Sequence, residues 1–170
     1  ITISNVVFNR SRGLALETAI LTPFAIILLR AVTPKDEQSL EGVEVADGLD
    51  SSVLIIGFGR FGQIVSQPLL ARGHTISIIE TDTESIRAAA EFGFKIYYGD
   101  GTRLDVLRAA GAGTAAAIAI CVDDRKAADR IVEMARAEFP QARLLVRSFD
   151  RGHSLHLIRA GVDYQIRETF

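Results

Sequence analysis

The chain has 170 residues, a formal net charge of −2 and a hydrophobic fraction of 48%. This length supports one hydrophobic core, and a near-neutral charge without a basic stripe argues against nucleic acid as the main partner. The single cysteine, Cys121, excludes an intrachain disulfide framework and a cysteine-rich metal site. The sequence begins at Ile1, so we expect a fragment or a processed form of a longer protein.

A mostly apolar run over residues 14–32 follows two arginines. A membrane span needs about 20 such residues, and the run contains Glu17 and Pro23. Both are tolerated in a bundle, where neighbouring helices satisfy the freed backbone group and a carboxylate can face the interior. We interpret 14–32 as a last transmembrane helix at the end of a membrane region (1–32). A buried or amphipathic helix of a soluble protein is the alternative.

Residues 33–51 predict a linker, because Pro34, Gly42, Gly48 and several acids occur there without a sustained period. From residue 52 onward, short apolar runs alternate with helical stretches. We expect strands at 53–56, 75–80, 95–98, 116–122, 143–148 and 163–166, and helices at 61–72, 83–92, 103–110, 124–138 and 151–160. Continuous apolar strands that are each followed by a helix predict an α/β fold, a Rossmann-like doubly wound parallel sheet over 52–170. Pro68 predicts a kink or an early end in the first of these helices.

A glycine-rich turn follows the first predicted strand. Its sequence, Gly57-Phe58-Gly59-Arg60-Phe61-Gly62, fits G-x-G-x-x-G and opens a predicted helix. Gly57 permits the tight turn, Gly59 lets the backbone approach a pyrophosphate, and Gly62 lets the helix pack close to the sheet. The helix N-terminus offers N–H groups to phosphates, and Arg60 can add a charge-assisted contact. We predict that these six residues bind a cofactor; a structural turn without a ligand is the alternative.

Acidic residues follow the next two predicted strands. Glu80 ends the second strand, where a carboxylate accepts hydrogen bonds from ribose hydroxyls and repels a 2′-phosphate. We therefore predict NAD(H), or a fragment such as AMP, with Asp82 as a weaker ribose candidate. After the third strand we predict cofactor contacts from Asp100 and Gly101. The alternative is that Asp100 or Thr102 caps the next helix.

Residues suited to catalysis are few. Asp123 and Asp124 predict a helix cap after the fourth strand, with contact to the ligand as the alternative. His153 and His156 lie three positions apart, but no carboxylate or cysteine at helical spacing completes a metal site. No serine elbow and no Walker lysine is present. We predict no catalytic residue, no metal site and no enzyme; a fragment of an NAD-dependent oxidoreductase is the alternative.

Four segments together carry a family resemblance: GFGRFGQ at 57–63, YYGDGTR at 97–103, AAG at 109–111 and RETF at 167–170. They resemble the cytosolic domain of Kef-type glutathione-gated potassium efflux systems, of the monovalent cation:proton antiporter-2 type. That domain is a TrkA-N domain, the N-terminal lobe of a regulator-of-potassium-conductance (RCK) domain. The resemblance covers 53–170, and Thr22-Pro23 resembles the last membrane helix before it.

The resemblance implies a regulatory domain on the cytoplasmic side of a bacterial inner membrane. It implies a homodimer that binds NAD(H) or AMP and gates potassium efflux coupled to proton entry. Glutathione keeps such transporters closed, and glutathione adducts open them. A stand-alone nucleotide sensor without a transporter is the alternative.

The same resemblance implies an effector site with two residues, Arg103 and Phe92. Arg103 falls at an arginine associated with glutathione, and Phe92 falls at the aromatic residue thought to sense the adduct. A surface cation and a core aromatic are the alternatives. Two positions depart from the family: Gln67-Pro68 stands where an arginine-containing helix is expected, and His153 stands where an asparagine is expected.

Overall fold

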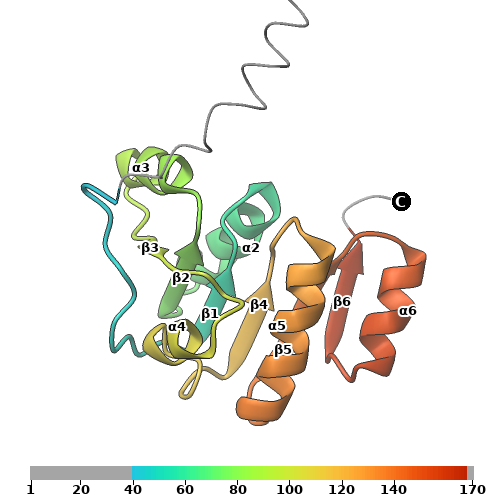
Figure 1. Cartoon of the computed structure of the whole chain (residues 1–170). Helices are drawn as coiled ribbons and strands as arrows, with labels where there is room; N and C mark the ends of the chain where they lie inside the picture. The colour runs from blue at the N-terminus through green and yellow to red at the C-terminus, as the bar shows by residue number, and fades with distance from the viewer. Residues whose placement is uncertain (1–39, 168–170) are drawn as a thin grey trace, which may run out of the picture. The chain divides into compact units, whose positions relative to one another are not determined.

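The computed structural model describes residues 40–167. The predicted apolar helix over 14–32 and the first part of the predicted linker lie outside this range. Within it, strands and helices alternate along the chain (Figure 1). The strands are β1 (Val53–Ile56), β2 (Ile76–Glu80), β3 (Tyr97–Tyr98), β4 (Ala117–Ile120), β5 (Arg143–Ser148) and β6 (Tyr164–Arg167). The helices are α2 (Arg60–Ala71), α3 (Thr83–Glu91), α4 (Leu104–Ala109), α5 (Arg125–Glu138) and α6 (Arg151–Arg159).

The strands form one sheet in the order β3-β2-β1-β4-β5-β6, and every pair is parallel. The chain first moves outward from β1 to β3 and then crosses back to continue from β4 to β6. The strand order therefore reverses between β1 and β4, which is where ligands bind in open parallel sheets. The predicted doubly wound sheet is confirmed. No helix in residues 40–167 is long and apolar enough to cross a membrane.

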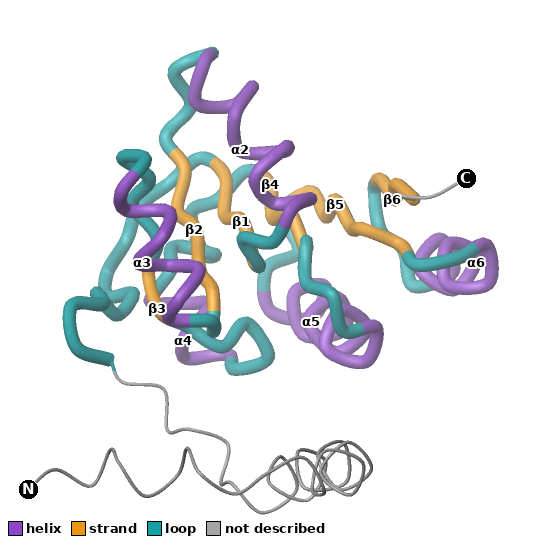
Figure 2. Tube along the Cα trace, turned by 90° about the horizontal axis from the view of Figure 1, so that it is seen from above, coloured by secondary structure: helices purple, strands orange, loops and turns teal. Residues whose placement is uncertain are grey.

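Helices cover both faces of the sheet, and Figure 2 shows α2 and α5 on opposite sides. Neighbouring residues of β1 point to different faces. Ile55 packs with Ile78 and Ile86 on the side of α2 and α3. Ile56 belongs instead to the cluster that contains Leu107 of α4, Ile131 of α5 and Leu157 of α6. Because both faces are buried, β1 and its neighbours are continuously apolar and do not alternate.

Aspartates begin three of the helices. Asp82, Asp124 and Asp150 occupy the N-cap positions of α3, α5 and α6, and each side chain accepts a backbone N–H of the first turn. Such a cap stabilises a helix by about 1 kcal/mol. The caps explain why these helices start directly after the ends of the preceding strands, in the right place to frame a cleft.

Helix α2 continues through Pro68 to Ala71, so the predicted early end is wrong. Proline fits the helical φ angle, but it removes one backbone donor and its ring crowds the carbonyl four residues earlier, so other contacts must hold the helix together here. Val65 and Leu69 of the same helix pack against the apolar cluster on this face. Burial of these side chains holds the last turns of α2 on the sheet.

The chain before β1 lies along the outer edge of β3. Val45 forms a parallel bridge with Tyr98. The Tyr98 N–H donates to the Glu44 carbonyl at 2.7 Å, and the Ala46 N–H donates to the Tyr98 carbonyl at 3.4 Å. Farther on, the Leu49 N–H donates to the Ala109 carbonyl at 2.9 Å. We call residues 44–49 the edge segment; it extends the sheet beyond its last regular strand.

The close contact between α2 and β1 yields a first prediction. An added Cβ at Gly62 would overlap the Gly57 carbonyl oxygen, which is backbone and cannot rotate away. We expect Gly62→Ala to lower the free energy of unfolding by about 3 kcal/mol, measured by urea denaturation. The control is Gly113→Ala, because nothing lies within 4 Å of a Cβ at Gly113. Equal stability of the two variants would contradict this packing.

Candidate functional site

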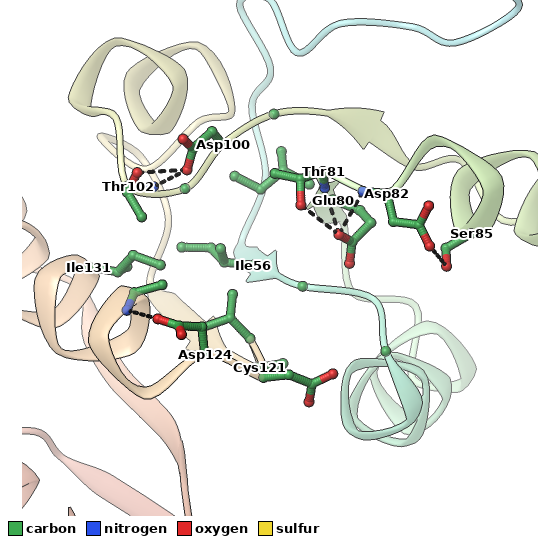
Figure 3. Close-up of a pocket in the computed structure, with 18 residues that line it drawn as sticks. Ile56, Glu80, Thr81, Asp82, Ser85, Asp100, Thr102, Cys121, Asp124 and Ile131 are labelled. Atoms are coloured by element: carbon green, nitrogen blue, oxygen red, sulfur yellow. Dashed lines mark hydrogen bonds between the residues drawn. The ribbon is translucent and has the colours of Figure 1, made fainter. Parts of the chain in front are cut away.

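A cleft of about 330 Å³ opens where the strand order reverses (Figure 3). We call it the switch-point cleft. Its walls come from the segments that follow β1, β2, β3 and β4, and from the first turns of α3 and α5. In Figure 3, Glu80, Asp100 and Asp124 lie around one opening although they follow three different strands. The size is at the lower end of small-molecule sites.

The glycine turn forms one wall of the cleft. Gly57 has a φ of +93°, which an L side chain rarely adopts, and its N–H donates to the Ile79 carbonyl at 2.9 Å. Gly57 and Gly59 line the cleft, whereas Gly62 lies behind them against the Gly57 carbonyl. At Gly59 an added Cβ would meet only an oxygen of Asp123, at 3.6 Å. The backbone at Gly59 is therefore open to a ligand.

The other members of the predicted motif have different surroundings. Phe58 is 3% exposed, and its ring lies 5.1 Å from that of Phe94. Phe61 packs in the same apolar cluster, on the side of α2 and α3. Arg60 is exposed at the first position of α2. The two phenylalanines thus anchor the turn to the core, while the glycines face the cleft.

Glu80 joins the second strand to the glycine turn. One carboxylate oxygen accepts the Phe58 N–H at 2.7 Å. The other accepts the N–H groups of Thr81 at 2.6 Å and Asp82 at 3.0 Å. Hydrogen bonds to a charged acceptor are worth about 1.5–3 kcal/mol each, so the side chain is held firmly. The oxygen that binds Phe58 keeps a second lone pair, which suits a ribose hydroxyl.

Asp100 closes its own turn and does not cap α4. One oxygen accepts the N–H of Thr102 at 2.9 Å and its hydroxyl at 2.7 Å. The residue before α4 is Arg103, and no side chain caps that helix, so the capping alternative is wrong. Gly101 lies against Ile56, whose methyl group a Cβ would overlap. Asp100 and Gly101 both line the cleft, so the predicted cofactor contacts remain a prediction.

The last wall follows β4. Asp124 caps α5 through the Ala127 N–H at 2.6 Å, as the sequence predicts. Asp123 forms an ion pair with Arg147 of β5. The residues that line the cleft include five carboxylates, and none of those described is a lysine or an arginine. The carboxylates are those of Glu80, Asp82, Asp100, Asp123 and Asp124.

Cys121 lies at the base of the cleft and is 2% exposed. Burial raises the pKa of its thiol to about 12, although the nearby charge of Arg147 acts in the opposite direction. The thiolate is the reactive form, so this thiol is chemically inert near neutral pH. Its contribution to the site is apolar packing.

The two predicted effector residues line separate hollows. Phe92 ends α3, is 81% exposed, and lines a hollow between α2 and α3 together with Gln67. Arg103 lines another hollow, beside the edge segment, with Tyr98 and Val45. The guanidinium of Arg103 binds Asp105 at 2.6 Å and 3.1 Å. Within one chain, the structure therefore does not bring Arg103 and Phe92 to a common pocket.

His153 is a core residue. Its side chain is fully buried. Nδ1 accepts the Phe149 N–H at 3.2 Å, so Nε2 carries the proton and donates to Asp129 at 2.9 Å. His156 reaches the same carboxylate at 3.6 Å. Both ring nitrogens of His153 are used in hydrogen bonds, and no group suited to a metal ion occurs in residues 40–167.

Comparison with known proteins identifies the domain. The TrkA-N domain family matches residues 53–168. The chain belongs to the TrkA-N domain family. The match begins at β1 and includes every wall of the switch-point cleft.

Two curated relatives are potassium efflux proteins. The chain is 43% identical over 153 residues to a glutathione-regulated potassium-efflux system protein of Haemophilus influenzae, covering 89% of this chain and 25% of that protein. It is 35% identical over 163 residues to the system protein KefC of Escherichia coli, covering 94% and 26%. The chain thus spans about a quarter of the length of these relatives.

Solved structures share the fold. The Kef C-terminal domain of Shewanella denitrificans in AMP-bound form has a TM-score of 0.59 at 38% identity, over 69% of this chain and 71% of that one. The TrkA-N domain of the Escherichia coli inner membrane protein ybaL has a TM-score of 0.64 at 21% identity, over 71% and 89%. The GsuK channel bound to NAD has a TM-score of 0.65 at 19% identity, over 87% and 27%. At these last two identities the likeness shows the fold alone.

Several residues of the cleft lie outside the sequence predictions. Thr81, Ser85 and Val122 line it because they immediately follow strands or begin helices at the same edge. That position is predictable from the strand ends. Arg147 does not line the cleft but pairs with Asp123, which does. It belongs to no motif, and the only signal in the sequence is a basic residue near the end of a strand adjacent to β4.

The buried thiol leads to a second prediction. At pH 8 the folded chain should react with a disulfide reagent at least about 100-fold more slowly than the urea-unfolded chain, because the thiolate and access are both suppressed. The raised pKa favours the protonated thiol in the folded state. The free energy of unfolding therefore keeps its full value below pH 9, where the thiol is protonated in both states, and falls as the pH rises towards 12. Rapid labelling without unfolding would show that Cys121 is accessible.

Proposed function

We propose that this domain binds AMP or NAD(H) in the switch-point cleft and thereby regulates a potassium efflux transporter. The observation that carries the proposal is the junction of Glu80 with the glycine turn. At this junction a carboxylate and a backbone without a side chain share one cleft wall, which supports contacts to a ribose and to a phosphate. The relative from Shewanella denitrificans binds AMP, which supports the same use of this cleft.

The charge of the cleft favours ligands with few phosphate groups. Five carboxylates line it, and the phosphates would rest on the N–H groups at the start of α2. Each additional phosphate or a 2′-phosphate adds charge beside these acids, at an energetic cost that rises in a partly enclosed site. We therefore expect AMP and NAD(H) to bind better than NADPH or ATP.

The transporter part of the proposal comes from the relatives. Glutathione-regulated potassium-efflux proteins match most of this chain, and the chain matches about a quarter of them. The domain would act as a regulator and not as an enzyme, on the cytoplasmic side of a bacterial inner membrane, with residues 14–32 as the last transmembrane helix. A homodimer of the domain and control by glutathione, through Phe92 and Arg103, are part of this proposal.

The variant Gly59→Ala separates binding from folding. An added methyl group meets nothing closer than 3.6 Å, and the backbone φ of −63° suits alanine, so stability should change by less than about 0.5 kcal/mol. The methyl group of Ala at position 59 would occupy the space through which a phosphate approaches the backbone. We expect AMP and NADH affinity, measured by titration calorimetry, to fall at least about tenfold.

The transport role is tested in the complete parent protein. There, Gly59→Ala should change potassium efflux from cells or vesicles in response to nucleotide, without changing the amount of protein in the membrane. If the variant loses nucleotide affinity but efflux is unaltered, the cleft binds nucleotide without regulating transport. If the unaltered chain binds neither AMP nor NADH, the proposed function is wrong.

Glu80→Gln tests the ribose contact. An amide keeps one acceptor but presents a donor to the backbone N–H groups around it, so NADH should bind about tenfold more weakly. NADPH should lose less, because the repulsive charge is removed. The ratio of the two affinities is the decisive measurement, since a general loss of folding would not shift it. Glu84→Gln, on α3 outside the cleft, should leave the ratio unchanged.

A further inference from the structure

The ion pair between Asp123 and Arg147 lies beside the glycine turn. Asp123 follows β4 and its side chain is 82% exposed, whereas Arg147 of β5 is only 14% exposed. One carboxylate oxygen of Asp123 binds the guanidinium, and the other lies 3.6 Å from the Cβ position of Gly59. A negative charge therefore stands against the part of the backbone that a phosphate would approach.

Arg147 approaches the turn from behind. The register of β4 and β5 pairs Ala119 with Leu145, so Arg147 continues the same row beside Cys121, on the side of α2. Its charge acts on Cys121, which in turn faces Gly62. The guanidinium also lies 5.1 Å from the ring centre of Phe149. A largely buried cation thus lies on the α2 side of the sheet, next to Cys121 and Asp123.

A phosphate and the Asp123 carboxylate would compete for the same partners. The start of α2 offers backbone N–H groups and a partial positive charge, and Arg147 offers a planar set of donors. Both anions fit these groups, but two anions in contact repel each other strongly in a site with little water. Asp123 is exposed and can turn into solvent, whereas Arg147 is enclosed by its neighbours.

We propose that Asp123 acts as a resident anion that a nucleotide phosphate must displace, and that Arg147 then pairs with the phosphate. This inference rests on the proposed nucleotide function. Asp123 lowers the affinity for the phosphate, so binding of the whole nucleotide depends more on the contact between its ribose and Glu80. Together with the N–H groups at the start of α2, Arg147 then distinguishes a nucleotide from a nucleoside.

The exchange has a measurable size. When a site is occupied by a competing group, the apparent affinity falls by the fraction of molecules in which the site is open. Removing the charge of Asp123 should therefore raise AMP affinity, by about tenfold if the pair is closed in nine molecules of ten. Adenosine has no phosphate, so its affinity should be unchanged.

The experiment is titration calorimetry of the 170-residue chain with AMP and with adenosine. Asp123→Asn should strengthen AMP binding about tenfold, and Arg147→Gln should weaken it about tenfold. Neither should change adenosine affinity by more than about twofold. The matched control is the exposed pair of Arg108 and Glu138, 2.6 Å apart on the opposite face, where Arg108→Gln and Glu138→Gln should have no effect.

Four outcomes overturn the inference. If Asp123→Asn binds AMP as the unaltered chain does, or more weakly, the ion pair is a fixed structural contact. If both ligands change equally, the pair acts on the whole cleft and not on the phosphate. If Arg147→Gln binds AMP as tightly as the unaltered chain does, Arg147 does not pair with the phosphate. If Arg147→Gln fails to fold, Arg147→Lys replaces it, and a Lys variant whose AMP affinity falls no more than its adenosine affinity also overturns the inference. Failure of the unaltered chain to bind AMP would instead refute the proposed function.

Discussion

The contact between α2 and the end of β1 is the constraint on which the cleft depends. Gly62 lies so close to the Gly57 carbonyl that no side chain fits between them. This approach sets the N-terminus of α2 beside the switch point, and a helix N-terminus presents backbone N–H groups. Glu80 then secures the turn from the second strand by accepting the Phe58 N–H. Packing and hydrogen bonding thus fix the shape of the glycine turn at the cleft.

Much of this was predictable from local signals. Continuous apolar runs followed by helices predict the parallel sheet, and the spacing of the glycines predicts the turn at its centre. The continuation of α2 beyond Pro68 was not predictable, because it depends on the burial of Val65 and Leu69, which outweighs the missing hydrogen bond. The position of His153 in the core was also not predictable, since its partner Asp129 is on another helix. Pairings such as Arg147 with Asp123 depend on strand order, which no short motif carries.

The cleft combines opposing electrostatic features. The N-terminus of α2 favours an anion at one end, while five carboxylates that line the cleft oppose excess negative charge. A ligand that suits both the anion-favouring end and the carboxylates has one compact anionic group and a polar, uncharged sugar. Nucleotides with a single phosphate or a diester pyrophosphate fit this description, and Cys121, neutral and buried, adds no competing chemistry at the base.

The edge segment has a mechanical consequence. It runs parallel to β3, and two of its three backbone hydrogen bonds involve Tyr98, directly before the turn that contains Gly99 and Asp100. A pull on the chain ahead of Glu44 would load these bonds together, in shear along the strand, instead of opening them one after another. Tension would then reach the wall of the cleft without first detaching the segment.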